Sequence, residues 1–437
     1  MLFSSLKRDW LSKENRLVAD NIISMGFVQI LNYLLPLITV PYLVRIIGVE
    51  FFGLLAFSSA TITYFVILTD YGFNLSATRQ IAIFRNDSEK IDEIFSGVMI
   101  IKILLLILSL FILGLLILFT SKFGENWVVH VFTFGTVVGH VLFPVWLFQG
   151  MEKIKHIVII TLVSKLLYLL GIFVFVVNSE DYFKVPIILA LSLLVSGIWS
   201  LNMAKTRLYV SFKFQKFDLL LAQVREGWHV FISSLTISFY TTSTTFILGF
   251  YANNTSVGYF AGSDRIVQAV KGIYSSFSQA IYPHTSKRIH DSAKSGLRDV
   301  FRISIFVAII MLFVSIFLFL FAENVVMFLL GSEFVPSILI LKIMSFLPLV
   351  VALSNLLGVQ ILLNLGFKRQ FLYIVFCTAI FGVSLSWFMA ANFFEVGLAY
   401  AVLGTEIIIT FVLSIYVFTI VKRNVKGIGL RDKPEVF

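Results

Sequence analysis

The sequence predicts an all-α polytopic membrane protein with about twelve transmembrane helices in two six-helix lobes and both termini in the cytoplasm. Three observations lead to this fold class. Hydrophobic residues make up 59% of the 437-residue chain and charged residues only 13%, with a mean hydropathy of +0.95. Long apolar runs recur along the chain, and Lys and Arg gather in alternate connections between them. A soluble protein of this length needs a charged surface, so soluble enzyme folds are excluded.

The N-terminal segment, residues 1–19, mixes basic and apolar side chains. Its basic residues Lys7, Arg8, Lys13 and Arg16 lie among apolar residues that form no run long enough for a signal peptide. This pattern is typical of an interfacial helix, which we expect on the cytoplasmic surface.

Twelve apolar segments, bounded by charged or turn-forming residues, are long enough to cross a bilayer, which needs about 20 helical residues. We expect spans at residues 20–46, 51–75, 94–120, 127–149, 156–177, 185–204, 228–250, 257–283, 299–321, 338–363, 371–391 and 396–421. The eighth is the weakest by hydropathy because polar residues recur along it.

Basic residues mark the predicted cytoplasmic side. With residues at a span edge counted on the nearer side, 26 of the 34 Lys and Arg belong to the two tails and the even-numbered connections. Three (Arg45, Lys122, Lys184) belong to the opposite side, and five lie inside spans. This asymmetry places both termini in the cytoplasm and explains the net charge of +10 without a nucleic-acid partner. The single cysteine, Cys377, lies in an apolar run, which excludes an intrachain disulfide and predicts an inert packing residue.

The basic connection at residues 205–227 divides the chain into an N-lobe at 20–204 and a C-lobe at 228–421, followed by a cytoplasmic tail at 422–437. Identical residues recur at one offset of 205 positions in the first hairpin of each lobe: Gly53 and Gly258, Ala56 and Ala261, Ser58 and Ser263. Because each lobe has an even number of spans, an axis along the membrane normal would relate the lobes, as in parallel-repeat transporters.

Nine ionisable residues are candidates for charges within the membrane, six cations and three anions: Arg45, Lys102, Lys165, Arg265, Lys271, Lys342, Asp70, Asp264 and Glu406. Charged side chains at this depth normally face protein or water. The alternative for Lys102, Lys165 and Lys342 is that they snorkel to the headgroups, and Arg45 lies near a span end. Arg265 and Lys271 are the least easily explained in this way.

The eighth span carries a stripe of small and polar residues on one helical face. Steps of three or four connect Ala261, Arg265, Gln268, Gly272, Ser275 and Gln279. This stripe predicts the wall of an aqueous cavity, and the alternative is a polar seam between helices. Asp264, although adjacent to Arg265 in sequence, is expected to point elsewhere on the helix.

The first, second and seventh spans are also polar, with Gln29 and Asn32 in the first and hydroxyls from Ser233 to Thr245 in the seventh. We therefore expect the first hairpin of each lobe to face a shared central cavity. A surplus of cations there favours an anionic cargo, and phosphate is the natural partner of Arg and Lys. The sequence contains no catalytic or nucleotide-binding motif, so we expect a transporter rather than an enzyme, without a cofactor or metal.

Residues Pro41–Phe57 (PYLVRIIGVEFFGLLAF), followed by Thr69–Phe73 (TDYGF) and Ala77–Arg79 (ATR), resemble the polysaccharide-transport family, in particular its Wzx-type O-antigen unit flippases. This family is part of the multidrug, oligosaccharidyl-lipid and polysaccharide exporter superfamily. The resemblance implies a MATE-like fold with a V-shaped cavity. It also implies ion-coupled, alternating-access transport of an undecaprenyl-pyrophosphate-linked oligosaccharide across the bacterial inner membrane. Peptidoglycan-precursor flippases of the superfamily have two extra helices, which argues against a lipid II substrate.

The resemblance implicates intramembrane Arg and Lys in holding the pyrophosphate, and Arg45, Arg265 and Lys271 are the candidates here. Candidates for hydrogen bonds to sugar are Gln29, Asn32, Gln268 and Gln279, and candidates for coupling to H+ or Na+ are Asp70, Asp264 and Glu406. The implied partners are membrane lipid, a polysaccharide polymerase and a chain-length regulator.

Two alternatives remain at this point. A cation-coupled multidrug exporter of the same fold would require an acidic cavity. A membrane-embedded polysaccharide polymerase would require a large periplasmic loop, and the longest outer connection, residues 322–337, is too short to form such a loop.

Overall fold

The computed structural model describes the backbone of residues 13–427. Side chains in this range are described except those of residues 13–31, 33–34, 237, 239–241, 280, 283–284, 293–294 and 420–427. The interfacial segment expected at 1–19 and the tail expected at 422–437 lie outside the described side chains. The backbone from 13 to 427 is helical and contains no β-strand.

The elements follow in the order α2 (Lys13–Asp70), α3 (Phe73–Ile83), α4 (Ser88–Phe119), α5 (Ser121–Gly124), α6 (Trp127–Leu142), α7 (Val145–Gly150), α8 (Ile154–Phe175), η1 (Ser179–Phe183), α9 (Lys184–Arg207), α10 (Phe217–Tyr251), α11 (Asn254–Asp291), α12 (Ala293–Leu320), α13 (Ala322–Leu329), η2 (Ser332–Phe334), α14 (Ser337–Met344), α15 (Leu347–Asn355), η3 (Leu356–Leu363) and α16 (Lys368–Gly427).

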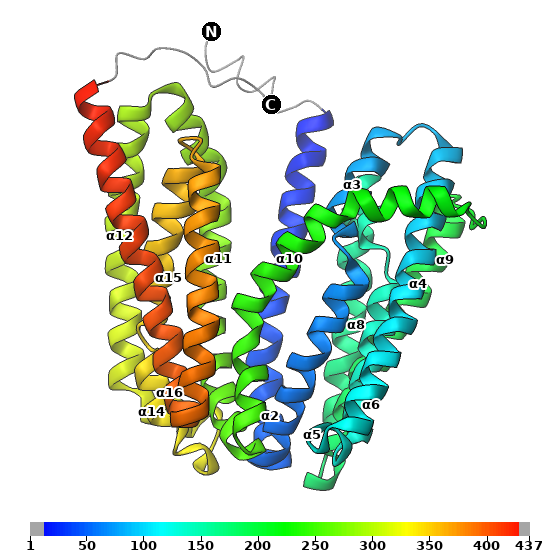
Figure 1. The fold of residues 1–437 in the computed structure, drawn as a ribbon, viewed down its shortest axis with the longest axis horizontal. Helices are drawn as coiled ribbons and strands as arrows, with labels where there is room; N and C mark the ends of the chain where they lie inside the picture. The colour runs from blue at the N-terminus through cyan, green and yellow to red at the C-terminus, as the bar shows by residue number, and fades with distance from the viewer. Residues whose placement is uncertain (1–12, 428–437) are drawn as a thin grey trace.

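The helices form two bundles that meet at one end and separate toward the other (Figure 1). One bundle contains α4, α6, α8 and α9, the other contains α11, α12, α14, α15 and α16, and α2 and α10 lie between them. We call the separated end, with the linker 208–216 and the turn before α16, the basic end. The opposite end, with the turns at Thr120 and Ala252, is the distal end.

Two long helices contain a break between two predicted spans. α2 breaks at Gly48, whose φ of 77° is a left-handed conformation that glycine adopts without a Cβ clash. α16 breaks at Phe394, with φ of 50°, between the spans predicted at 371–391 and 396–421. Each break lets the chain reverse direction and pack as an antiparallel pair.

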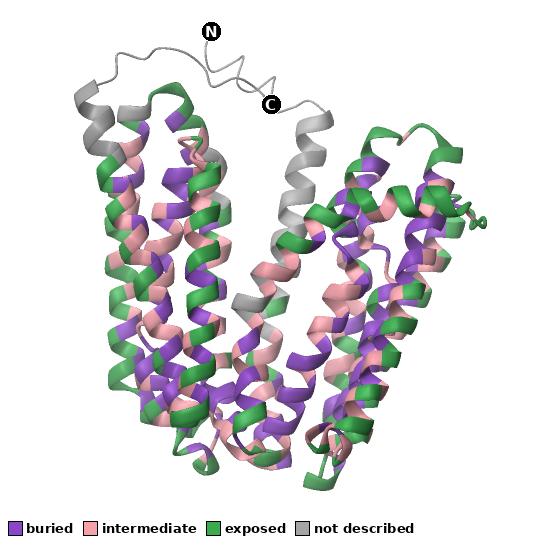
Figure 2. Cartoon of the chain, in the orientation of Figure 1, coloured by how far each residue is buried: buried purple, intermediate pink, exposed green. Residues whose placement is uncertain are grey.

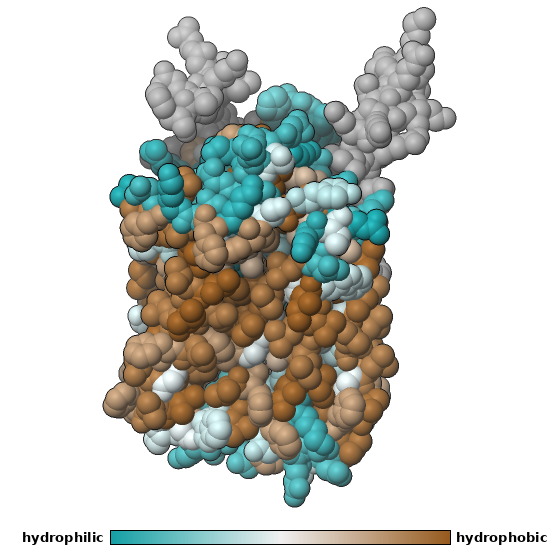
Figure 3. Space-filling view, turned by 90° about the vertical axis from the view of Figure 1, so that its right-hand side faces the viewer, coloured by the Kyte–Doolittle hydropathy of each residue, from teal (hydrophilic) through white to brown (hydrophobic). Residues whose placement is uncertain are grey.

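Eight segments of the described chain are long and apolar enough to cross a membrane. Two of them, Leu35–Ile83 and Lys368–Thr419, contain the breaks at Gly48 and Phe394. α10 and α11, which carry the seventh and eighth predicted spans, are not among the eight because polar residues lower their hydropathy. An apolar belt lies between hydrophilic residues at both ends (Figure 3). The chain is therefore a multi-pass membrane protein, and the count of twelve spans stays a prediction.

Two predicted boundaries differ from the structure. The second span was expected to reach residue 75, but α2 ends at Asp70 because Tyr71 and Gly72 both have positive φ. The connection expected at 205–227 is shorter, since α9 ends at Arg207 and α10 begins at Phe217. Hydropathy underestimates the lengths of α9 and α10, because the ends of these helices that border the connection are polar.

The two bundles pack closely at the distal end, where buried residues are concentrated between them (Figure 2). A Cβ built on Gly53 of α2 would lie 2.6 Å from the backbone nitrogen of Gly258 in α11 and 1.8 Å from the carbonyl oxygen of Asn254. A Cβ on Gly258 would lie 2.3 Å from the carbonyl oxygen of Val49. The two glycines related by the 205-residue offset therefore meet, and their lack of side chains permits this helix crossing.

Candidate functional site

A cavity of about 510 Å³ lies between α2 and α10 on one side and the bundle that contains α11 and α16 on the other. Its polar lining comes from α2 (Asn32, Ser59, Thr63), α10 (Thr242, Ser243, Thr244, Thr245), α11 (Asp264, Arg265, Gln268, Lys271) and α16 (Ser386, Thr405, Glu406). The first hairpin of each predicted lobe thus faces one shared space, as expected. On α16, Glu406 was a candidate from the sequence, whereas Ser386 and Thr405 were not singled out.

α11 supplies most of the ionisable lining. Arg265 and Lys271 both line the cavity, Arg265 exposed and Lys271 partly buried, with Lys271 six residues further along the helix and about 120° around it. At 1.5 Å per residue their Cα atoms are separated by about 9 Å along the helix axis. Two cations at this separation can contact one elongated anion together or two anionic groups separately.

Asp264 also lines this cavity, although it points about 100° away from Arg265 around the helix. Its Oδ1 accepts a hydrogen bond from Nε2 of Gln268 at 3.2 Å. The cavity covers a wide arc of α11, and neighbouring residues on a helix differ by only about 100° in direction. A polar face that is three or four residues wide therefore includes both Asp264 and Arg265.

The ionisable residues among the described lining are two cations and two anions, Arg265 and Lys271 against Asp264 and Glu406. Their formal charges balance, which corrects the expectation of a cavity with a surplus of positive charge. The sequence count was misleading because the remaining cations lie elsewhere. None of Arg45, Lys102, Lys165 and Lys342 lines the cavity.

Arg45 lies at the distal end, where its guanidinium donates a hydrogen bond to the carbonyl oxygen of Phe328 in α13. Next to it, the carboxylate of Glu333 in η2 accepts a hydrogen bond from the backbone N–H of Val49 at 3.4 Å. We call these four residues the distal latch. The latch joins the break in α2 to the distal connection of the other bundle, so Arg45 is separate from the cavity in this conformation.

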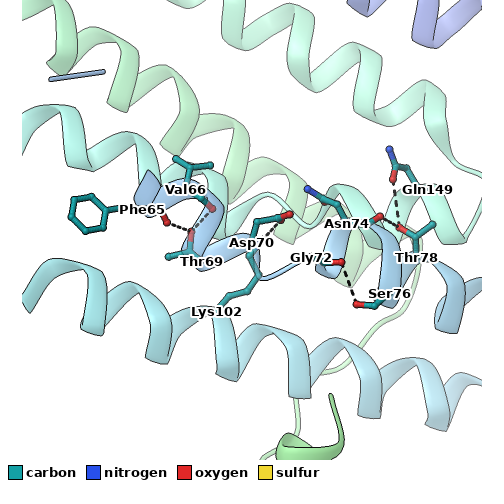
Figure 4. Close-up of polar contacts among 10 residues, drawn as sticks. All are labelled: Phe65, Val66, Thr69, Asp70, Gly72, Asn74, Ser76, Thr78, Lys102 and Gln149. Carbon is teal, nitrogen blue, oxygen red and sulfur yellow. Dashed lines mark hydrogen bonds and ion pairs between the residues drawn. The ribbon is translucent and has the colours of Figure 1, made fainter. Parts of the chain in front are cut away.

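Asp70 and Lys102 form an ion pair in the bundle that contains α4, outside the central cavity (Figure 4). Nζ of Lys102 is 3.5 Å from Oδ1 of Asp70, and the lysine side chain is only 4% exposed. Lys102 therefore reaches a carboxylate within the protein rather than the headgroups.

Among the amides predicted to contact cargo, Asn32 and Gln268 line the central cavity and Gln279 lines a neighbouring one. The side chain of Gln29 lies outside the described residues. Cys377, predicted to be a packing residue, is exposed on α16. No group of three or more His, Cys, Asp or Glu side chains in the described part of the chain is placed to hold a metal ion.

Comparison with solved structures supports the architecture. An inward-facing structure of a multidrug resistance MATE family transporter of the MOP superfamily superposes with a TM-score of 0.70 at 15% identity, covering 93% of this chain and 99% of the other. The lipid II flippase MurJ in an inward closed conformation gives a TM-score of 0.67 at 14% identity, covering 91% and 87%. An outward-facing MATE structure gives 0.54. The fold is therefore MATE-like, as predicted.

Sequence comparison narrows the class to a family. Residues 18–289 match the family described as polysaccharide biosynthesis protein, and the chain belongs to that family. A protein of Escherichia coli (strain K12) named "Putative O-antigen transporter" is 33% identical over 401 residues, covering 91% of this chain and 96% of the relative. A protein of the same name from Shigella dysenteriae is 27% identical over 391 residues, covering 89% and 97%. These relatives confirm the resemblance seen in the first hairpin.

Proposed function

We propose that this protein is a flippase that moves an undecaprenyl-pyrophosphate-linked oligosaccharide across the bacterial inner membrane. The observation that carries the proposal is the polar cavity lined by α2, α10, α11 and α16, to which α11 contributes both Arg265 and Lys271. Relatives named as O-antigen transporters supply the cargo class. The polyprenyl tail stays in lipid, because only the polar part of the cargo needs an aqueous cavity.

The two cations suit a pyrophosphate better than a single negative charge. A pyrophosphate has two phosphoryl groups, and the long side chains of Arg265 and Lys271 can converge on them from Cα atoms about 9 Å apart along α11. Asp264, one of the two acids that line the cavity, already accepts a hydrogen bond from Gln268. Asn32, Thr63 and the hydroxyls of α10 offer hydrogen bonds to sugar.

The distal contacts support alternating access. In this conformation the Gly53–Gly258 crossing and the distal latch hold the bundles together at the distal end, while the bundles separate at the basic end. The basic end is the predicted cytoplasmic side. Exposure of the cavity to the other side requires these contacts to open and the basic ends of the bundles to approach.

The charge balance of the cavity supports the proposal that transport is coupled to an ion. Protonation of Asp264 or Glu406 would leave one uncompensated positive charge, which favours an anionic cargo, and loss of the proton would favour its release. We place coupling on these two acids rather than on Asp70, which pairs with Lys102 outside the cavity. Flipping by Glu406→Gln and Asp264→Asn proteins in proteoliposomes should lose its dependence on a proton gradient. A dependence equal to that of the wild type would exclude these acids.

The test of the cargo site is complementation of a bacterium that lacks its O-antigen flippase. Arg265→Ala and Lys271→Ala, separately and together, should reduce surface polysaccharide at normal protein level. A hydrogen bond to a charged group contributes about 1.5–3 kcal/mol, which corresponds to roughly 10- to 150-fold in binding. Lys165→Ala is the control, because this intramembrane lysine does not line the cavity. Full polysaccharide levels in the double variant would refute the assignment.

Export of cationic drugs is the second candidate, favoured by one observation. The cavity contains Asp264 and Glu406, so its charge does not exclude a cationic cargo. The named relatives favour the oligosaccharide. Cells that express the protein should therefore show no gain in resistance to lipophilic cations, and a gain that depends on Glu406 would support the exporter.

A further inference from the structure

Two smaller cavities continue from the central cavity along α11 toward the basic end. One, of about 240 Å³, is lined by Gln268, Lys271, Ser275 and Asn355, and the next, of about 330 Å³, by Ser275, Gln279, Tyr282 and Asn355, among others. Gln268 and Lys271 also line the central cavity, so the three spaces follow one another on one helix. None of the described residues that line the last cavity is charged.

Asn355 lies at a backbone irregularity. It is the last residue of α15, and the next eight residues, Leu356–Leu363, form the π-helix η3. π-helical turns are rare and occur frequently at functional sites. Here Gln360, which is 2% exposed, ties η3 to α11: its Nε2 donates to the carbonyl oxygen of Ser278 at 3.1 Å, and its Oε1 accepts from the hydroxyl of Thr285 at 2.6 Å.

The orientation of the Asn355 amide is fixed by its oxygen. The hydroxyl of Ser278 donates to Oδ1 at 2.6 Å. The hydroxyl of Tyr274 lies 3.2 Å from the same oxygen and 3.1 Å from the carbonyl oxygen of Ala352, so it shares one proton between them. Both acceptor positions of Oδ1 are therefore used within the protein. The NH₂ group of Asn355, with two donors, remains for a ligand in the two cavities that this residue lines.

We propose that Ser275, Gln279, Tyr282 and Asn355, here called the Asn355 strip, bind the uncharged sugar part of the cargo. The amide of Asn355 donates to a sugar hydroxyl or N-acetyl oxygen, and the other three provide further polar contacts. Tyr282, the far end of the strip, lies eleven residues beyond Lys271, or about 16 Å along the helix. The cargo then lies along α11, with its phosphates at Arg265 and Lys271 and its sugars toward the basic end.

This inference rests on the proposed function and is tested by comparing two probes. Undecaprenyl pyrophosphate contains only the part assigned to Arg265 and Lys271, and undecaprenyl-pyrophosphate-linked oligosaccharide contains the sugars as well. Binding of both to the full-length protein in nanodiscs gives the ratio of the two affinities, which measures the sugar contribution.

Asn355→Asp is the informative variant, because its carboxylate keeps the acceptor for Ser278 and Tyr274 but lacks the N–H donors. Affinity for the sugar-linked probe should fall about tenfold relative to the sugar-free probe. Any effect of the added negative charge on phosphate binding appears with both probes and cancels in the ratio. A ratio equal to that of the wild type would overturn the inference.

Gln279→Leu is a second variant on an exposed position of α11, for use if Asn355→Asp does not fold. It should lower the same ratio about threefold, and an unchanged ratio there also contradicts the inference. Failure of the proposed function looks different. In that case the wild type binds the sugar-free probe no better than Arg265→Ala/Lys271→Ala does.

Discussion

Gly53→Ala tests whether the crossing of α2 and α11 closes the distal end. The new Cβ would lie 1.8 Å from the carbonyl oxygen of Asn254, whereas ordinary van der Waals contact begins at 3.4 Å. The helices would have to separate by roughly 1.6 Å, or the substitution would have to be accommodated as overpacking, which costs about 1–3 kcal/mol. This cost falls on the distal-closed state alone. The distal-open population should therefore rise roughly 5- to 150-fold relative to the closed one.

The assay is a distance measurement by electron paramagnetic resonance. Spin labels at Glu125 and Val335, exposed distal residues in opposite bundles, report the separation of the bundles in a Cys377→Ser background that removes the exposed native thiol. We expect longer distances in Gly53→Ala and reduced surface polysaccharide.

The matched control is Gly114→Ala in α4, since no atom lies within 4 Å of a Cβ at that position. It should leave both the distances and the polysaccharide unchanged. If Gly53→Ala gives the wild-type distance distribution and full transport, the reasoning about the glycine crossing is refuted.

Three further predictions follow from buried or bridging contacts. Asp70→Asn leaves the buried Lys102 ammonium without its carboxylate, which should lower the free energy of unfolding by about 3–5 kcal/mol and with it the melting temperature. Adding Lys102→Met should restore the melting temperature, and a double variant as unstable as the single one would contradict the ion-pair account. Glu333→Gln replaces the charged acceptor of the distal latch and should weaken the latch by about 1 kcal/mol. A cysteine placed at the distal end should then be labelled faster, and unchanged labelling would argue against the latch. Gly139→Ala places a Cβ 2.5 Å from Cβ of Leu193 within one bundle, and this overpacking should cost about 1–3 kcal/mol. The melting temperature should fall while the distal distances stay the same. A wild-type melting temperature would show that the two helices can separate freely.

The positions of the helices could be predicted because the bilayer imposes length and hydropathy on each span. The predicted boundaries at 46–51 and 391–396 contain the breaks at Gly48 and Phe394. The spacing of Arg265 and Gln268 was sufficient to predict that one face of α11 lines a cavity, because helical periodicity decides which residues share a face.

The charge balance of the cavity could not be predicted. It depends on which ionisable residues the tertiary structure brings together, and sequence order does not carry that information. Lys102 pairs with Asp70, and Arg45 contacts Phe328, 283 residues away along the chain. The role of Asn355 was also hidden, because a lone amide before an apolar run gives no sign of a π-helix or of the hydroxyls that orient it.

A cryo-electron-microscopy structure with undecaprenyl-pyrophosphate-linked oligosaccharide bound would test the central claim most directly. We predict phosphate density within about 3 Å of the guanidinium of Arg265 or the ammonium of Lys271, with the bundles still joined at Gly53 and Gly258. Phosphate density at the outer surface of the bundles, with the central cavity free of cargo, would contradict the account.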